Sequence, residues 1–103
     1  MKTTVVNLRT YKDPNVVRAD RTTSFGNPFH IGKDGNREMV VSKHKIWLIM
    51  WLKRGEEIII GGYSNKWVCQ HVKQLRGRKL GCWCVPRRCH VENLIWLLRC
   101  KND

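Results

Sequence analysis

Four side chains that can bind a metal or react as nucleophiles are gathered near the C-terminus. They are Cys82, Cys84, Cys89 and His90, in the spacing Cys-x-Cys-x4-Cys-His. Three thiolates and one imidazole form an accepted tetrahedral ligand set for zinc. The spacing differs from the usual pair of Cys-x2-Cys knuckles, and the adjacent ligands Cys89 and His90 would have to diverge and then reconverge on the ion. A zinc site held by these four residues and a metal-free cysteine site with no cofactor are both open alternatives.

The metal-free alternative turns the same segment into an anion-binding or reactive site. Arg87 and Arg88 stand beside Cys89 in a turn that follows Pro86. A helix that begins after this turn offers free backbone N–H groups and the positive end of its dipole to an anion. These surroundings also lower the pKa of a thiol, as a nucleophilic cysteine requires, and His90 could transfer the proton. In an enzyme, the catalytic residues would therefore be Cys89 and His90.

The charge of the chain favours partners that carry phosphate. Twenty Lys and Arg residues against eight Asp and Glu give a net charge of +12. The segment from Lys66 to Lys101 holds nine basic residues and a single acid, Glu92. A positive surface attracts phosphates, so nucleic acid or a nucleotide is the expected partner. Trp83, among these cations, could stack a base, and exposed tryptophans could instead serve as hot spots for a host protein.

The chain shows no signal for export or membrane insertion. No apolar segment follows the first residues, and no run of roughly 18 apolar residues exists. The number of cysteines is five, which is odd. In a chain without an export signal, cysteines are expected as free thiols, metal ligands or catalytic groups rather than as disulfides. We therefore expect a cytoplasmic protein without a membrane partner.

The pattern of apolar and turn-forming residues predicts how the first half of the chain folds. Residues 3–8 are short and β-branched, which indicates a buried strand. Residues 9–36 are rich in turn formers and predict a long ordered loop. Asn36 or Gly35 can open a helix whose apolar face continues until Gly55 ends it.

The second half of the chain predicts alternating strands and helices. Residues 57–61 favour a strand, and Ser64 or Asn65 can cap a helix that ends at Gly77. Residues 78–85 predict a strand ended by Pro86, which would place Cys82 and Cys84 on one face, and residues 91–100 predict a last helix. The whole predicts an α/β fold in one small domain, residues 1–103, with a short, mostly parallel sheet of about three strands packed by about three helices.

Three motifs resemble a known family. The motifs are VVNLR at residues 5–9, GNPF at residues 26–29 and GCWCVPRRCH at residues 81–90, and together they span most of the chain. They resemble a phage and bacterial family, number 4326 among the domains of unknown function. Val91 stands where that family usually has Gly, and Ser24-Phe25 stand where it usually has Trp or Lys-Trp. The resemblance implies a phage context, with the cytoplasm of the host cell as location, and one pocket formed by GNPF and the cysteine turn.

Such a pocket has an expected set of binding residues. Loops at the carboxyl ends of parallel strands line the ligand crevice of α/β sheets. Asn27 would offer an amide to a base or ribose edge, and Arg9 would add a cation from the end of the first strand. We therefore expect a small basic protein that binds nucleic acid or a nucleotide-like phosphate ligand, zinc-stabilised in one alternative. The alternative function is an enzyme acting on a nucleotide or phosphorylated small molecule, and the second alternative is a phage effector that binds a host protein. The expected binding residues are Arg9, Asn27, Trp83, Arg87 and Arg88.

Overall fold

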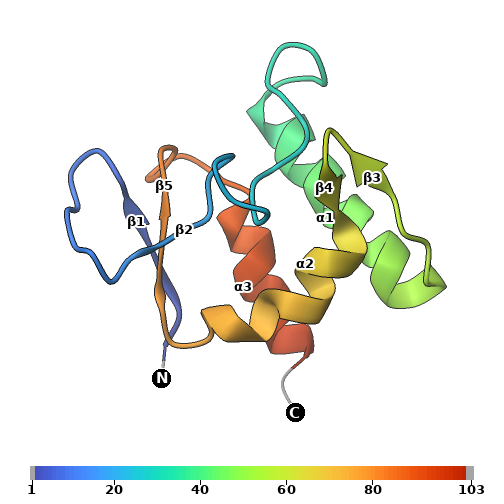
Figure 1. Ribbon diagram of the computed structural model, residues 1–103. Helices are drawn as coiled ribbons and strands as arrows, with labels where there is room; N and C mark the ends of the chain where they lie inside the picture. Colours follow the sequence, from blue (N-terminus) through green and yellow to red (C-terminus); the bar gives the residue numbers. More distant parts are fainter. Residues whose placement is uncertain (1, 102–103) are drawn as a thin grey trace.

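A three-stranded parallel sheet forms one layer of the fold. The computed structural model describes residues 2–101. The strands are β1 (Thr4–Asn7), β5 (Lys79–Cys82) and β2 (Val17–Arg18), and β5 lies between the other two. Leu80 of β5 is opposite Val5 on one side and Val17 on the other. The last strand in sequence therefore forms the centre of the sheet (Figure 1).

A glycine in the central strand allows the first loop to close against it. A Cβ atom at Gly81 would lie 2.8 Å from Cγ1 of Val16 and would also meet the side chain of Leu8. Only a residue without a side chain leaves room for both groups. The loop between β1 and β2 therefore packs directly on β5.

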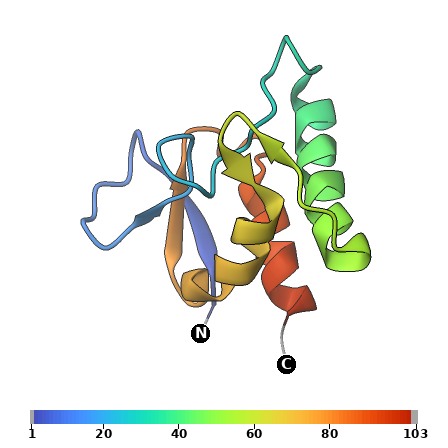
Figure 2. The ribbon, with the colours of Figure 1, turned by 45° about the vertical axis from the view of Figure 1, so that its right-hand side comes forward.

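Three helices lie to the same side of the sheet (Figure 2). In α1 (Arg37–Arg54), Asn36 Oδ1 accepts a hydrogen bond from the Met39 N–H at 2.9 Å, and Gly55 ends the helix with φ of +64°. The other two helices are α2 (Asn65–His71), which continues as a 3-10 turn at Val72–Leu75, and α3 (Val91–Cys100). The three predicted helices and the predicted cap at Asn36 are confirmed, but the helix expected to end at Gly77 ends as an α-helix at His71, before the 3-10 turn.

The core fills the space between the helices and β5. Leu48 of α1, Val68 of α2, Leu94 and Leu97 of α3, and Leu80 of β5 are all fully buried. The α/β fold with a short parallel sheet is therefore confirmed. No helix within residues 2–101 is long and apolar enough to cross a bilayer.

Two strand predictions need correction. The segment predicted as a strand at residues 57–61 contains β3 (Ile59–Ile60), but β3 pairs with β4 (Tyr63–Ser64) in a separate antiparallel hairpin. Ile59 is 64% exposed there, because the hairpin lies outside the parallel sheet. The third strand of the sheet is β2, which lies inside the segment predicted as a loop. A two-residue strand is too short to produce a periodic signal.

Candidate functional site

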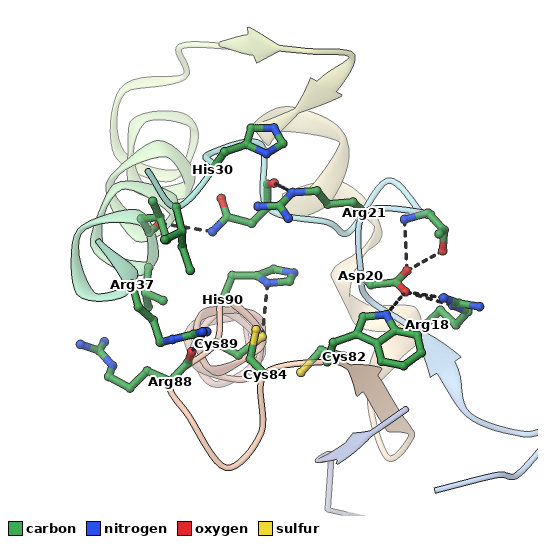
Figure 3. Close-up of a pocket in the computed structure, with 16 residues that line it drawn as sticks. Arg18, Asp20, Arg21, His30, Arg37, Cys82, Cys84, Arg88, Cys89 and His90 are labelled. Atoms are coloured by element: carbon green, nitrogen blue, oxygen red, sulfur yellow. Dashed lines mark hydrogen bonds and ion pairs between the residues drawn. The ribbon is translucent and has the colours of Figure 1, made fainter. Parts of the chain in front are cut away.

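A cavity of about 430 Å³ opens where β2 and β5 end. Its walls come from the segment after β2, the GNPF loop, the first turn of α1 and the cysteine turn before α3 (Figure 3). This position, outside the carboxyl ends of parallel strands, is the usual ligand site of α/β sheets. The volume lies within the range that small-molecule sites occupy.

The cavity is lined by more positive than negative charge. Arg18 forms an ion pair with Asp20 at 2.5 Å, and Arg88 pairs with Glu92 at 2.6 Å and also with Glu38. Asp20 is the one acid among the residues that line the cavity. Four guanidinium groups line it, those of Arg18, Arg21, Arg37 and Arg88.

Two of these guanidinium groups bind only backbone carbonyl groups within residues 2–101. Arg21 donates from Nε to the Asn27 carbonyl at 3.2 Å and from Nη2 to the Phe29 carbonyl at 2.8 Å. Arg37 donates from Nη1 to the carbonyl of Arg88 at 3.3 Å. A carbonyl orients a guanidinium group without neutralising it. Both arginines therefore keep a full positive charge and further N–H donors for an anion.

Asp20 fixes one end of the cavity. Its Oδ2 accepts hydrogen bonds from Arg18 and from Nε1 of Trp83, the latter at 2.9 Å, and its Oδ1 accepts from the backbone N–H of Thr22 at 3.1 Å. Burial alone would raise the pKa of Asp20, but these hydrogen bonds outweigh it and hold the pKa well below its usual range. The carboxylate is thus charged at neutral pH and orients the indole of Trp83, which is 48% exposed.

The residues of the GNPF loop hold the cavity wall in place rather than offer free groups to a ligand. A Cβ atom at Gly26 would lie 2.7 Å from the carbonyl oxygen of Asp20 and 2.7 Å from Cα of Arg21, so only glycine fits. Asn27 lines the cavity, but its Nδ2 donates to the Val40 carbonyl at 3.3 Å and its Oδ1 accepts from the Phe29 N–H at 2.9 Å. The Asn27 amide therefore already joins the loop to α1.

The cysteine turn begins earlier than predicted. β5 ends at Cys82, whose carbonyl accepts the N–H of Leu8 at 2.8 Å, and the chain then turns so that the Arg87 N–H bonds the Cys84 carbonyl at 2.8 Å. The expected strand at residues 78–85 is thus too long, and strand alternation is not what brings Cys84 near Cys82. Cys82, Cys84, Cys89 and His90 nevertheless all line the cavity.

The surroundings of the cluster lower the pKa of Cys82 and not that of Cys89. The Cys89 thiol hydrogen-bonds to Cys82 Sγ, and the backbone N–H groups of Cys84 and Val85 donate to the same sulfur. Against the effect of burial, these bonds lower the pKa of Cys82 to about 6. The hydrogen bond to Cys82 and burial both raise the pKa of Cys89. The expected lowering at Cys89 is therefore wrong, because its thiol is buried and acts as a donor.

His90 connects the cysteine turn to the GNPF side of the cavity. Its Nε2 lies 2.8 Å from the Ala19 carbonyl oxygen and 2.9 Å from that of Phe25, so this nitrogen carries the proton. Its Nδ1 faces Cys89 Sγ at 3.5 Å. Burial lowers the pKa of His90 to about 4, so the ring is neutral near pH 7 and Nδ1 is an acceptor.

The predicted site residues fall into two groups. Asn27, Trp83 and Arg88 line the cavity together with the cysteine cluster, whereas Arg9 and Arg87 are exposed outside its lining. Within residues 2–101, no group of three or more His, Cys, Asp or Glu side chains is arranged to hold a metal ion. Zinc binding therefore stays a prediction. Among the arginines and acids of the lining, sequence reasoning missed Arg18, Asp20, Arg21 and Arg37.

Comparison with known proteins identifies a family and a phage relative. Residues 6–99 match the family described as Domain of unknown function (DUF4326). The chain is also 36% identical over 83 residues to the "Uncharacterized 12.4 kDa protein in nrdA-td intergenic region" of Enterobacteria phage T4. That alignment covers 80% of this chain and 66% of the phage protein. No solved structure matches the chain.

Proposed function

This chain belongs to the family Domain of unknown function (DUF4326), and from its cavity we propose that it binds a nucleoside phosphate. The observation that carries the proposal is the pair Arg21 and Arg37, which line the cavity and bind only carbonyl groups within the described residues. A phosphate would accept their remaining N–H groups. Each hydrogen bond to a charged group contributes about 1.5–3 kcal/mol.

The opposite end of the cavity supplies a surface for a base. Asp20 and Arg18 lie across the cavity from Arg37 and Arg88 (Figure 3), and the Trp83 indole is hydrogen-bonded to Asp20. The indole is held by Asp20, and the Arg18 guanidinium carbon lies 5.9 Å from its ring centroid. A base stacked on an oriented, half-exposed tryptophan gains about 1–3 kcal/mol. A ligand with a base at one end and a phosphate at the other matches both ends of the cavity.

Isothermal titration calorimetry tests this proposal. We expect a nucleoside monophosphate to bind with one site per chain, and the matching nucleoside to bind at least tenfold more weakly, because loss of one charge-assisted contact costs about 1.4 kcal/mol or more. Raising the salt concentration should weaken the binding of the monophosphate and leave the binding of the nucleoside nearly unchanged. Equal affinity for the two ligands would contradict a phosphate role for the arginines.

A nucleic acid strand is the second candidate, favoured by the net charge of +12. Cations also stack on tryptophans outside the cavity, with Lys45 Nζ 4.5 Å from the Trp96 ring centroid and Lys66 Nζ 5.4 Å from that of Trp51. Fluorescence anisotropy of a labelled single-stranded oligonucleotide tests this candidate. Binding to a strand predicts a steep linear fall of log affinity with log salt concentration, because several phosphates release counterions together.

A further inference from the structure

A basic surface lies at the end of the molecule opposite the cavity. The cavity opens where β2 and β5 end, whereas this surface lies where β1 and β5 begin. The turn that leads into β5 and the last turn of α3 both lie at this end (Figure 1 and Figure 2). Its segments, residues 2–4, 73–79 and 99–101, contain no acid. We call their seven cations the basic end, and these are Lys2, Lys73, Arg76, Arg78, Lys79, Arg99 and Lys101.

Hydrogen bonds hold the first two of these segments together. The Thr3 hydroxyl oxygen accepts a hydrogen bond from the Gly77 N–H at 2.8 Å. Thr4 is opposite Lys79 in the parallel sheet. The chain around Lys2 is therefore fixed beside the turn before β5, and residues that are more than seventy positions apart contribute to one surface.

The positive charge of the basic end is not neutralised inside the protein. Lys2, Lys73 and Lys79 are exposed, and within residues 2–101 their ammonium groups form no ion pair or hydrogen bond. Arg78 donates from Nη2 to the carbonyl of Asn15 at 3.2 Å, which leaves its charge in place. These side chains can therefore contact an anionic partner without breaking an ion pair of the fold.

We propose that the basic end binds the phosphate backbone of double-stranded nucleic acid. Several cations on one surface match a polyanion, because each neutralised phosphate releases counterions. The three segments contain no aromatic residue, so the bases of a single strand would have no stacking surface there. A duplex presents its phosphates outward and needs no such surface. The proposal goes beyond nucleotide binding in the cavity and does not depend on it.

The composition of the basic end also argues against a membrane surface as partner. Proteins that lie on a bilayer combine cations with apolar or aromatic side chains that enter it. The one large apolar side chain of the three segments, that of Leu75, is fully buried. A surface that offers charge alone is typical of contact with a nucleic acid backbone.

Fluorescence anisotropy of a labelled DNA duplex at several salt concentrations tests the proposal. Lys73→Gln combined with Lys79→Gln should raise the Kd about tenfold or more at low salt. It should also make the slope of log affinity against log salt shallower by about 1.8, since each lost phosphate contact accounts for about 0.9. Lys33→Gln combined with Lys53→Gln, two exposed lysines outside the basic end, is the matched control. The control should change the Kd by less than about threefold and keep the slope.

The two proposed sites fail separately. A nucleoside monophosphate at saturating concentration should not displace the duplex from the parent protein, and its displacement would overturn the proposal. Equal effects of the two lysine pairs, tighter binding of a single strand of the same length, or no duplex binding would also overturn it. So would binding of phosphatidylserine vesicles in place of the duplex. Calorimetry with the monophosphate tests the cavity alone, so its outcome leaves this result unchanged.

A measurement on the unchanged protein keeps the test decisive if a variant does not fold. Lysine acetylation followed by peptide mass spectrometry, with and without the DNA duplex, reports which ammonium groups the duplex covers. The duplex should slow acetylation of Lys73 and Lys79 and leave Lys33 and Lys53 reactive. The reverse pattern would place the duplex elsewhere on the protein and overturn the proposal.

Discussion

The indole Nε1 of Trp83 donates a hydrogen bond to Oδ2 of Asp20 at 2.9 Å, although the two residues are 63 positions apart in the chain. Trp83 follows β5 and Asp20 follows β2, so the bond joins the ends of two neighbouring parallel strands. It also fixes the indole at one end of the cavity. The orientation of the proposed base-stacking surface therefore depends on a single buried carboxylate.

Removing the indole should weaken nucleotide binding with little effect on phosphate alone. We expect Trp83→Leu to raise the Kd for a nucleoside monophosphate by roughly five- to a hundredfold, because stacking contributes about 1–3 kcal/mol per base. Calorimetry with the monophosphate and with ribose 5-phosphate measures the difference. Trp96→Leu is the matched control, since Trp96 also carries a stacked lysine but lies outside the cavity lining. Equal losses in the two variants would argue against stacking at Trp83.

Gly26 should tolerate no side chain. In Gly26→Ala the new methyl group would meet the backbone of Asp20 and Arg21, and backbone cannot rotate away as a side chain can. We expect the free energy of unfolding to fall by about 1–3 kcal/mol, which is the usual cost of overpacking. Urea denaturation measures it. Ser24→Ala, an exposed change in the same loop, should stay within about 0.5 kcal/mol of the parent protein. A Gly26→Ala variant as stable as its parent would contradict the described loop packing.

Stability should depend on pH through two buried histidines. Burial lowers the pKa of His90 to about 4 and that of His44 well below 6.5, and the two ring centroids lie 5.0 Å apart. Below pH 6.5 the two imidazoles bind protons in the unfolded chain but stay neutral in the folded chain. Stability is therefore fully present above pH 6.5 and is lost as the pH falls toward 4, by about 1.4 kcal/mol per pH unit for each histidine.

The slope of stability against pH identifies these residues. Urea unfolding of the parent protein, His44→Gln and His90→Gln at several pH values between 6.5 and 4 gives the three slopes. Each variant should have a shallower slope of stability against pH than the parent protein, whatever its stability at neutral pH. Unchanged slopes would show that neither imidazole stays neutral in the folded protein.

Local signals predicted the helices and the place of the cysteine turn. Asn36 and Ser64 are capping residues, and each accepts a hydrogen bond from the backbone N–H three positions later in the chain. Such a short spacing can be recognised in the sequence. The start of α3 at Val91 was likewise predicted from the residues just around it. Such features depend on neighbours in sequence and can be inferred without the fold.

The missed features depend on partners far away in sequence. β2 is two residues long and exists because β5 pairs with it across more than sixty positions. Arg18 and Asp20 line the cavity because Arg18 ends that strand and Asp20 follows it, so no local pattern marks them. The lowered pKa of Cys82 was missed for a different reason, because its causes are hydrogen bonds from Cys89, Cys84 and Val85 that the spacing alone does not specify.

The most direct test of the nucleotide-binding account compares Arg37→Ala with Arg87→Ala. Arg37 lines the cavity and makes one hydrogen bond there at 3.3 Å, whereas Arg87 is exposed outside the lining. Each change removes one positive charge. The difference in Kd between the two variants therefore measures direct contact with the ligand, apart from the overall positive charge of the protein. Calorimetry with a nucleoside monophosphate should show a Kd raised roughly ten- to a hundredfold in Arg37→Ala and by less than about threefold in Arg87→Ala. Equal effects of the two changes, or no binding by the parent protein, would contradict the account.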